Sequence, residues 1–237
     1  MAEKLYIMPH QGLGDHILCS GIYRTLSRNY DLTVIPVFKK NHKALEKLLR
    51  DEKKIEVVSY GNWMPTMEPH RDFLKKIGYK ILNLGGFAGG NIPNGLRFDA
   101  WFYQQAKVPF SARWDAFNYE RDIQKENALF KKIVPSRGKY IFVHEDPSRG
   151  YTLDRHIIPK KFEIVSAEPA LRRQYTPFDY YKILENAEEI HCIESSFGAF
   201  IESIKISSPK FAHRYARPEA KSDYRQEFTY KTDWKIL

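Results

Sequence analysis

Short apolar runs alternate along the chain with segments whose apolar residues recur at every third or fourth position. In the first part of the sequence, such runs predict buried strands at residues 4–9, 31–37, 55–60 and 79–84. Helical spacing between the runs predicts helices over residues 17–26, 44–49 and 72–77. Because strand and helix alternate, we expect a parallel sheet joined by right-handed crossovers.

The same alternation begins again in the second half. Residues 85–95 form a glycine-rich loop, and helical spacing returns from Phe98 and again over residues 120–133. The PSRG segment at residues 135–138 interrupts this spacing. The strands and helices predicted after it are residues 139–144, 162–167, 177–187, 189–194 and 210–213, with one more helix from Ser195 or Ser196. We therefore expect two α/β domains, residues 1–134 and 135–237.

The composition is that of a folded, soluble protein. Of the 237 residues, 43% are apolar and 28% are charged, which excludes a disordered or fibrous chain. The first ten residues are too charged for a signal peptide, and no run approaches the roughly 18 apolar residues of a membrane helix. Cys19 and Cys192 lie far apart in apolar segments, which indicates reduced core residues. We expect a cytoplasmic protein without a membrane span.

The net charge is positive, at 38 − 29 = +9. This charge admits nucleic acid, a membrane surface or a phosphorylated small molecule as a partner. The basic residues, however, occur as scattered pairs such as Lys75-Lys76 and Arg172-Arg173, with acidic residues between them. A nucleic-acid-binding surface requires a clustered basic stripe, so a phosphorylated small molecule is the favoured partner.

The loop after the first predicted strand, HQGLGDH at residues 10–16, is the first candidate site. Ligands of open α/β sheets bind beyond the carboxyl ends of the strands, and Gly12 and Gly14 permit close approach of the backbone to a ligand. Ile17 occupies the position where a dinucleotide-binding motif needs its third glycine, and the lysine of a P-loop is absent. Neither a nicotinamide cofactor nor a P-loop nucleotide is supported.

Asp15 has two interpretations in this loop. It is placed to cap the following helix, and it is equally suited to act as a general base. One carboxylate does both only if one of its oxygens stays free. His10 and His16 flank it, and without further ligands of suitable spacing they indicate substrate contact or polar lining rather than a metal site.

The loop at residues 144–156, HEDPSRGYTLDRH, is the second candidate. The guanidinium of Arg149, beside Gly150, is suited to bind a phosphate through two hydrogen bonds, although exposed turns often contain arginine for no functional reason. Glu145 and Asp146 are adjacent on a strand end and point in different directions, which argues against a metal site there.

The third candidate, ESSFGAF at residues 194–200, begins a helix after a buried strand. A helix N-terminus offers unpaired N–H groups and partial positive charge, and the hydroxyls of Ser195 and Ser196 add donors, so a diphosphate fits there. Simple helix capping by serine is the alternative. Because Arg149 is predicted to lie at the same edge of the sheet, the two loops together indicate a diphosphate site.

Two segments resemble a known family. GLGDHILCSGIYRTL at residues 12–26 resembles the opening loop and helix of the heptosyltransferase group of GT-B glycosyltransferases. EIHCIESSFGAFIESI at residues 189–204 is similar to the acid-Thr-Gly helix start of that group, with Glu194, Ser195 and Ser196 in the three positions. HEDPSRG is more loosely similar to the H-x-R-R-G-D segment of fucosyltransferases.

The resemblance implies a GT-B-like fold, with two small Rossmann-like domains whose parallel sheets face a central cleft. Residues 1–134 would bind the acceptor and residues 135–237 the nucleotide-sugar donor. The resemblance also implies catalysis without a metal or cofactor, the nucleotide-diphosphate sugar being a co-substrate. GT-B enzymes are usually longer than this chain, which would be a minimal version.

The resemblance also assigns roles to the candidate residues. Asp15 would be the catalytic base, in an acceptor loop that also contains His10, Gly12, Gly14 and His16. The residues expected to bind the donor are Arg149, Glu168, Glu194, Ser195, Ser196 and Phe197. Of these, Arg149 and the two serines would stabilise the leaving diphosphate, while Glu194 and Glu168 would bind sugar or ribose hydroxyls.

The function expected from these features is an inverting hexosyltransferase that acts on a glycan or glycoconjugate acceptor. A deoxyhexose such as rhamnose or fucose is the sugar that the family likeness indicates. Two alternatives remain open at this point. One is a nucleotide-sugar-binding protein without catalysis, and the other, less favoured by the scattered charges, is a nucleic-acid-binding protein.

Overall fold

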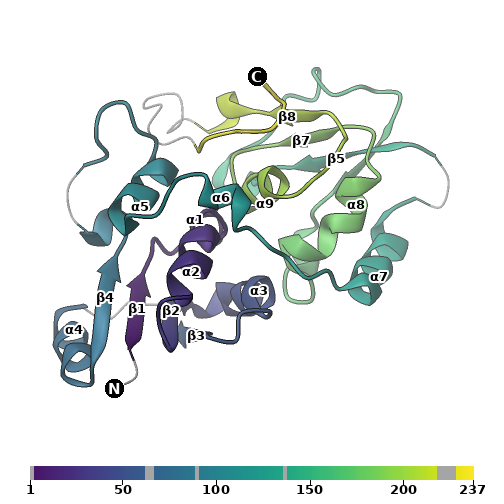
Figure 1. Ribbon diagram of the computed structural model, residues 1–237. Coiled ribbons are helices and arrows are strands. Elements are labelled where there is room, and N and C mark those ends of the chain that lie inside the picture. The colour runs from purple at the N-terminus through teal and green to yellow at the C-terminus, as the bar shows by residue number, and fades with distance from the viewer. Residues whose placement is uncertain (1–2, 62–66, 89–90, 136–137, 218–227) are drawn as a thin grey trace. The chain divides into compact units, whose positions relative to one another are not determined.

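Figure 1 shows the computed structural model, which describes residues 3–61, 67–88, 91–135, 138–217 and 228–237. The chain divides into two compact units, Met1–Glu120 and Arg121–Leu237, called here the first and second unit. This division falls earlier than the expected boundary after Val134. The reason is that helix α7 (Ile123–Ile133), which was expected to end the first domain, packs against α8 (Tyr181–Glu185) of the second unit.

The first unit is built on a parallel sheet in the order β3-β2-β1-β4 among the described residues. Its strands are β1 (Lys4–Met8), β2 (Leu32–Phe38), β3 (Ile55–Tyr60) and β4 (Tyr79–Asn83). Lys4 of β1 is in register with Leu32 on one side and with Tyr79 on the other. The strands match the predicted runs closely because each is a short, mainly apolar segment between polar loops.

Helices pack on this sheet in the described part of the first unit. They are α1 (Leu13–Leu18), α2 (Ser20–Ser27), α3 (Lys39–Leu49), α4 (Met67–Lys76), α5 (Phe98–Ala106) and α6 (Ala112–Asp115), with a short 3₁₀ helix η1 (Gly85–Ala88). Helix α3 packs on β2 and β3, and α4 packs on β4. The core between strands and helices contains fully buried Ile7, Ile17, Ile22 and Leu45.

The second unit has a parallel sheet in the order β6-β5-β7-β8-β9 among the described residues. Its strands are β5 (Tyr140–His144), β6 (Glu163–Ser166), β7 (Ile190–Cys192), β8 (Lys210–Ala212) and β9 (Trp234–Ile236). Its helices are α7, α8 and α9 (Ser196–Ser203), with 3₁₀ helices η2 (Pro147–Arg149), η3 (Pro169–Leu171), η4 (Pro177–Tyr180) and η5 (Arg214–Ala216). The expected α/β class, with one parallel sheet in each half, is confirmed.

Strand β9 was not predicted from the sequence. Its approach to the sheet is fixed by Glu202 of α9, a buried carboxylate that accepts hydrogen bonds from the backbone N–H of Lys231 (2.7 Å) and from Trp234 Nε1 (2.7 Å). The hydroxyl of Thr232 donates to the same carboxylate at 2.7 Å. A carboxylate 30 residues away in the chain therefore specifies this strand, and the short local sequence does not.

Candidate functional site

The strand order places a switch point in each sheet, where connections from neighbouring strands leave in opposite directions. Ligands of open α/β sheets bind at such points, beyond the carboxyl ends of the strands. In the first unit this point lies between β1 and β4, and in the second between β5 and β7. The three candidate loops follow β1, β5 and β7, so each lies at a switch point of its own unit.

The Asp15 loop (residues 9–15) comprises the connection from β1 to α1 and the first turn of α1. Gly12 is the N-cap of α1 in an extended conformation, and its backbone N–H donates to Asp15 Oδ2 at 3.1 Å. A Cβ on Gly12 would lie 2.6 Å from the same oxygen, so a larger residue there would displace the carboxylate. Asn41 of α3 holds the loop by donating to the carbonyl of Gln11 at 3.1 Å. Gly14 is the second residue of α1.

His10 contacts the same carboxylate oxygen. Its Nδ1 lies 3.2 Å from Asp15 Oδ2, and the side chain is 54% exposed. This hydrogen bond raises the pKa of His10, against the opposing effect of partial burial. The loop after β4 approaches His10 closely, because a Cβ on Gly85 would lie 3.2 Å from its ring. His10 therefore lies where the two loops of the switch point meet.

Asp15 meets the condition for both of its proposed roles. Oδ2 carries the capping bond and the His10 contact, while Oδ1 has no hydrogen-bond partner among the described residues. The side chain is 20% exposed. One oxygen is thus committed to the fold and the other is available to a hydroxyl group.

His16 is the residue after Asp15 in α1, and its side chain points into the core. It is completely buried, and its Nδ1 lies 3.1 Å from the hydroxyl of Tyr23. Burial lowers the pKa of His16 to about 4, so the imidazole is neutral. His16 is a core residue of the first unit and does not form a ligand set with His10.

The arginine loop (residues 144–156) follows β5 in the second unit. Arg149 ends η2, and its Nε donates to Asp146 Oδ2 at 2.8 Å. Its guanidinium also lies over the ring of Tyr151, 4.8 Å from the centroid. The side chain is 55% exposed, and its Nη groups have no hydrogen-bond partner among the described residues. Arg149 is therefore oriented through Nε while its outer edge remains available to an anion.

Helix α9 begins directly after β7. Ser195 is its N-cap, and the Ser195 hydroxyl accepts a hydrogen bond from the backbone N–H of Gly198 at 3.4 Å. Ser196 is half-buried and forms no side-chain hydrogen bond with the described residues. Phe197 is buried, with its ring 5.1 Å from that of Tyr180. The serines lie at the helix start as expected, whereas the Phe197 side chain packs within an aromatic core.

The two acidic candidates differ in exposure. Glu194 is 1% exposed, and its Oε1 accepts a hydrogen bond from Tyr230 Oη at 3.1 Å, with Arg214 Nε at 3.4 Å. Its carboxylate is thus engaged by residues near the C-terminus. Glu168, after β6, is exposed and occupies the N-cap position of η3 without a side-chain capping bond. Only Glu168 presents its carboxylate to solvent.

Two residues near the arginine loop were not singled out from the sequence. Arg172 follows β6 and η3, is exposed, and lies close enough to His144 to lower the pKa of that imidazole. His144 is the last residue of β5, and its ring packs against that of Phe197 with centroids 4.3 Å apart and planes tilted by 33°. The position of Arg172 after a strand was a usable signal, because residues after parallel strands gather at one edge.

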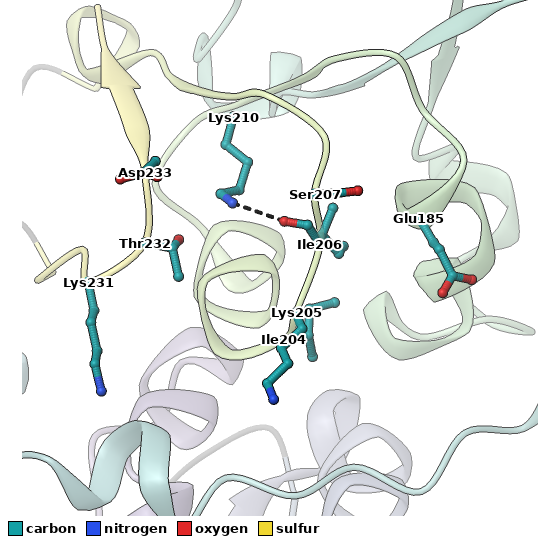
Figure 2. Close-up of a pocket in the computed structure, with 9 residues that line it drawn as sticks. All are labelled: Glu185, Ile204, Lys205, Ile206, Ser207, Lys210, Lys231, Thr232 and Asp233. Carbon is teal, nitrogen blue, oxygen red and sulfur yellow. Dashed lines mark hydrogen bonds between the residues drawn. The ribbon is translucent and has the colours of Figure 1, made fainter.

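A cavity of about 630 Å³ lies at the amino ends of the strands of the second sheet, opposite the candidate loops of that unit. It is lined by segments that precede β7, β8 and β9, and none of the predicted site residues belongs to it. Figure 2 shows its lysines, Lys205, Lys210 and Lys231, with ammonium groups that do not converge; Lys210 donates to the Ile206 carbonyl at 3.3 Å. The candidate loops, at the carboxyl edge, are therefore the better supported site.

Two features are absent from the described residues. No group of three or more His, Cys, Asp or Glu side chains is arranged as a metal site. No helix there has the length and apolar character needed to span a membrane.

No family model matches the chain, and no curated protein matches its sequence. Two solved structures are similar to it. Escherichia coli ADP-heptose LPS heptosyltransferase II superposes with a TM-score of 0.52 at 10% identity, over 89% of this chain and 84% of that one. The iron-containing dodecameric glycosyltransferase TibC of enterotoxigenic Escherichia coli superposes with a TM-score of 0.53 at 12% identity, over 97% of this chain and 61% of that one. The chain has the heptosyltransferase-like GT-B fold that its sequence motifs indicated.

Proposed function

We propose that the chain is an inverting glycosyltransferase that moves a sugar from a nucleotide-diphosphate donor to an acceptor hydroxyl. The observation that carries this proposal is the different environment of the two Asp15 oxygens. Oδ2 caps α1, and Oδ1 has no hydrogen-bond partner among the described residues. A free carboxylate oxygen at a switch point is what a general base requires. The fold shared with two glycosyltransferases supports the same reaction class.

In this proposal Asp15 Oδ1 accepts the proton of the acceptor hydroxyl. The acceptor oxygen forms a bond to the anomeric carbon as the bond from that carbon to the diphosphate oxygen breaks. The electron pair of the broken bond leaves on the diphosphate, and the configuration at the anomeric carbon inverts because attack and departure occur on opposite sides. No metal or cofactor enters this route.

The second unit supplies the groups that would bind the leaving diphosphate. The outer edge of Arg149 and the first N–H groups of α9, with the hydroxyls of Ser195 and Ser196, place positive partial charges where negative charge develops. Glu168 would accept a hydrogen bond from a sugar or ribose hydroxyl. A deoxyhexose as the transferred sugar remains an expectation from the family likeness.

Asp15→Asn tests the base assignment. The asparagine keeps an oxygen that accepts from Gly12 N–H, so α1 stays capped, but the amide cannot take a proton from the acceptor. With a panel of nucleotide sugars, we expect release of the nucleoside diphosphate to slow by about 10²–10⁴-fold, with its binding affinity nearly unchanged. Asp72→Asn, at an exposed carboxylate of α4, is the matched control and should keep full activity.

Turnover by Asp15→Asn equal to that of the wild type would show that Asp15 is not the base. The non-catalytic alternative gives a different result. A nucleotide-sugar-binding protein would bind donors equally well in both forms and would release no nucleoside diphosphate from any of them.

A further inference from the structure

His144 is a buried imidazole that the fold leaves without a hydrogen-bond partner. It is 7% exposed at the carboxyl end of β5, and neither ring nitrogen is hydrogen-bonded within the described residues. Nδ1 is fully enclosed, so Nε2 is the nitrogen that keeps contact with solvent. Buried polar groups in folded proteins are nearly always paired, and unpaired ones often mark a place where a ligand supplies the partner.

The surroundings of His144 indicate which ligand that is. Its ring packs against that of Phe197 in α9, and this contact places it beside the start of that helix. Arg149 and Arg172 are the cationic groups that act on it, and Asp146 is the anionic one. Asp146 is already bonded to Arg149 Nε and to the hydroxyl of Ser148. An anion is therefore the ligand that this combination favours.

The imidazole itself is uncharged at neutral pH. Burial, and next the charge of Arg172, lower the pKa of His144 to about 3. A neutral imidazole whose Nε2 carries the proton donates one hydrogen bond without adding charge. Arg172 is exposed, and its guanidinium has no hydrogen-bond partner among the described residues. The two side chains thus offer complementary contacts, one neutral and one charged.

We propose that His144 and Arg172 bind the diphosphate of the donor together with Arg149 and the start of α9, a set we call the anion site. In this site Arg172 supplies positive charge and His144 Nε2–H donates an uncharged hydrogen bond to a phosphoryl oxygen. Two guanidiniums suit two adjacent phosphoryl groups better than a single one. This inference rests on the proposed function, because it assigns residues to the donor side of that reaction.

Calorimetric titration of the full chain with pyrophosphate, UDP, GDP and inorganic phosphate tests the inference without any need for turnover. His144→Phe keeps an aromatic ring against Phe197 and removes both nitrogens. We expect it to lower pyrophosphate affinity about tenfold, the effect of one lost hydrogen bond to a charged group. We expect its melting temperature to stay equal or rise, because an unpaired buried polar group is removed. A residue with only a structural role would not show this combination.

Salt dependence separates the two contacts. Arg172→Met should weaken pyrophosphate binding about tenfold or more at low salt, and less at high salt, because a charged contact is screened. The loss in His144→Phe should be the same at both salt concentrations. Arg173→Met, at the adjacent exposed arginine, is the matched control and should bind like the wild type. His144→Gln, whose amide reaches the position of Nε2, should recover most of the affinity.

The outcomes distinguish this inference from the proposed function. If the wild type binds diphosphates and both His144→Phe and Arg172→Met bind them equally well, the anion site is wrong and the proposed function stands. Equal losses in Arg172→Met and Arg173→Met would indicate diffuse charge attraction and would also overturn it. If His144→Phe does not fold, His144→Gln and Arg172→Met still decide the question. No binding of any diphosphate to the wild type would overturn both proposals.

Discussion

Asp15 and His10 form a hydrogen-bonded pair whose net charge changes when His10 gains or loses a proton. Protonated His10 is an ion-pair partner of Asp15 Oδ2 and places a positive charge beside the carboxylate. Neutral His10 still donates a hydrogen bond through Nδ1–H but carries no charge. The state of His10 is therefore expected to appear in the pH dependence of the reaction.

We expect turnover to rise with pH through the pKa of His10, which its hydrogen bond to Asp15 raises above 6.5. In His10→Gln the amide still donates to Asp15 but does not titrate, so this limb of the pH–rate profile should disappear. Because the folded-state pKa is raised, the pairing stabilises the fold below pH 6.5 and is lost as the pH rises through the raised value. An NMR titration of His10 checks the pKa, and an unchanged limb in His10→Gln would contradict this account.

Single residues also show what the sequence could and could not predict. The positions of Asp15, Arg149 and Ser195 after strands could be predicted because each belongs to a recognisable strand-loop-helix pattern. The burial of Glu194 was not foreseen, because its partner Tyr230 lies 36 residues further along the chain. The lack of a hydrogen-bond partner for buried His144 also depends on the folded surroundings, and no pattern in the neighbouring sequence predicts it.

Gly21 lies where α2 packs closely on α6, and the packing leaves no room for a side chain there. A Cβ on Gly21 would lie 2.1 Å from the carbonyl oxygen of Ala112, a backbone atom that cannot move aside without shifting α6. We expect Gly21→Ala to lower the free energy of unfolding by about 1–3 kcal/mol, the usual effect of overpacking. Chemical denaturation measures this change.

Gly86→Ala is the control for this substitution, because a Cβ there meets no atom within 4 Å. Its effect should stay within about 0.5 kcal/mol. Equal stability of Gly21→Ala and the wild type would show that α2 and α6 do not pack as described.

At the scale of elements, long apolar runs were predicted well and short segments were not. Strands β1 to β4 lie within a residue or two of their expected positions, because alternating apolar runs fix them. Helix α6 has only four residues, too few to show a period. The single helix expected over residues 177–187 is instead a 3₁₀ turn, η4, followed by α8.

The two units are expected to differ in acid stability. In the second unit burial lowers the pKa of His144 to about 3 and of His213 to about 4, and that of His191 is also lowered. Below pH 6.5 the unfolded chain takes up protons that these folded residues do not, so stability falls as the pH falls. Each such histidine costs up to about 1.4 kcal/mol per pH unit.

The first unit has one comparably shifted histidine among its described residues, His16, with a pKa of about 4. The second unit should therefore lose stability more steeply between pH 6.5 and 4. Hydrogen exchange measured across this range should show the amides of β5 and β7 losing protection before those of β1 and β2. The reverse order would contradict this expectation.

For the whole molecule, alternation of strands and helices predicted the α/β class and the two parallel sheets, but not the order of the strands. The strand order depends on whether each connection adds the next strand to one side or the other of the strands before it. The resulting order places the switch points beside Asp15 and His144. The boundary between the units also depends on contacts between segments distant in sequence. The structure divides after Glu120 and not after residue 134, because α7 packs with α8 and η4, which follow it in the chain.

The central claim is that the second unit binds the diphosphate of a nucleotide sugar while Asp15 performs the chemistry. Calorimetric titration of the full chain with a panel of nucleoside diphosphates tests it most directly. We expect at least one to bind with a dissociation constant between about 1 μM and 1 mM, with affinity about tenfold weaker in Arg149→Ala and unchanged in Asp15→Asn. Absence of binding by every diphosphate up to millimolar concentration would contradict the account.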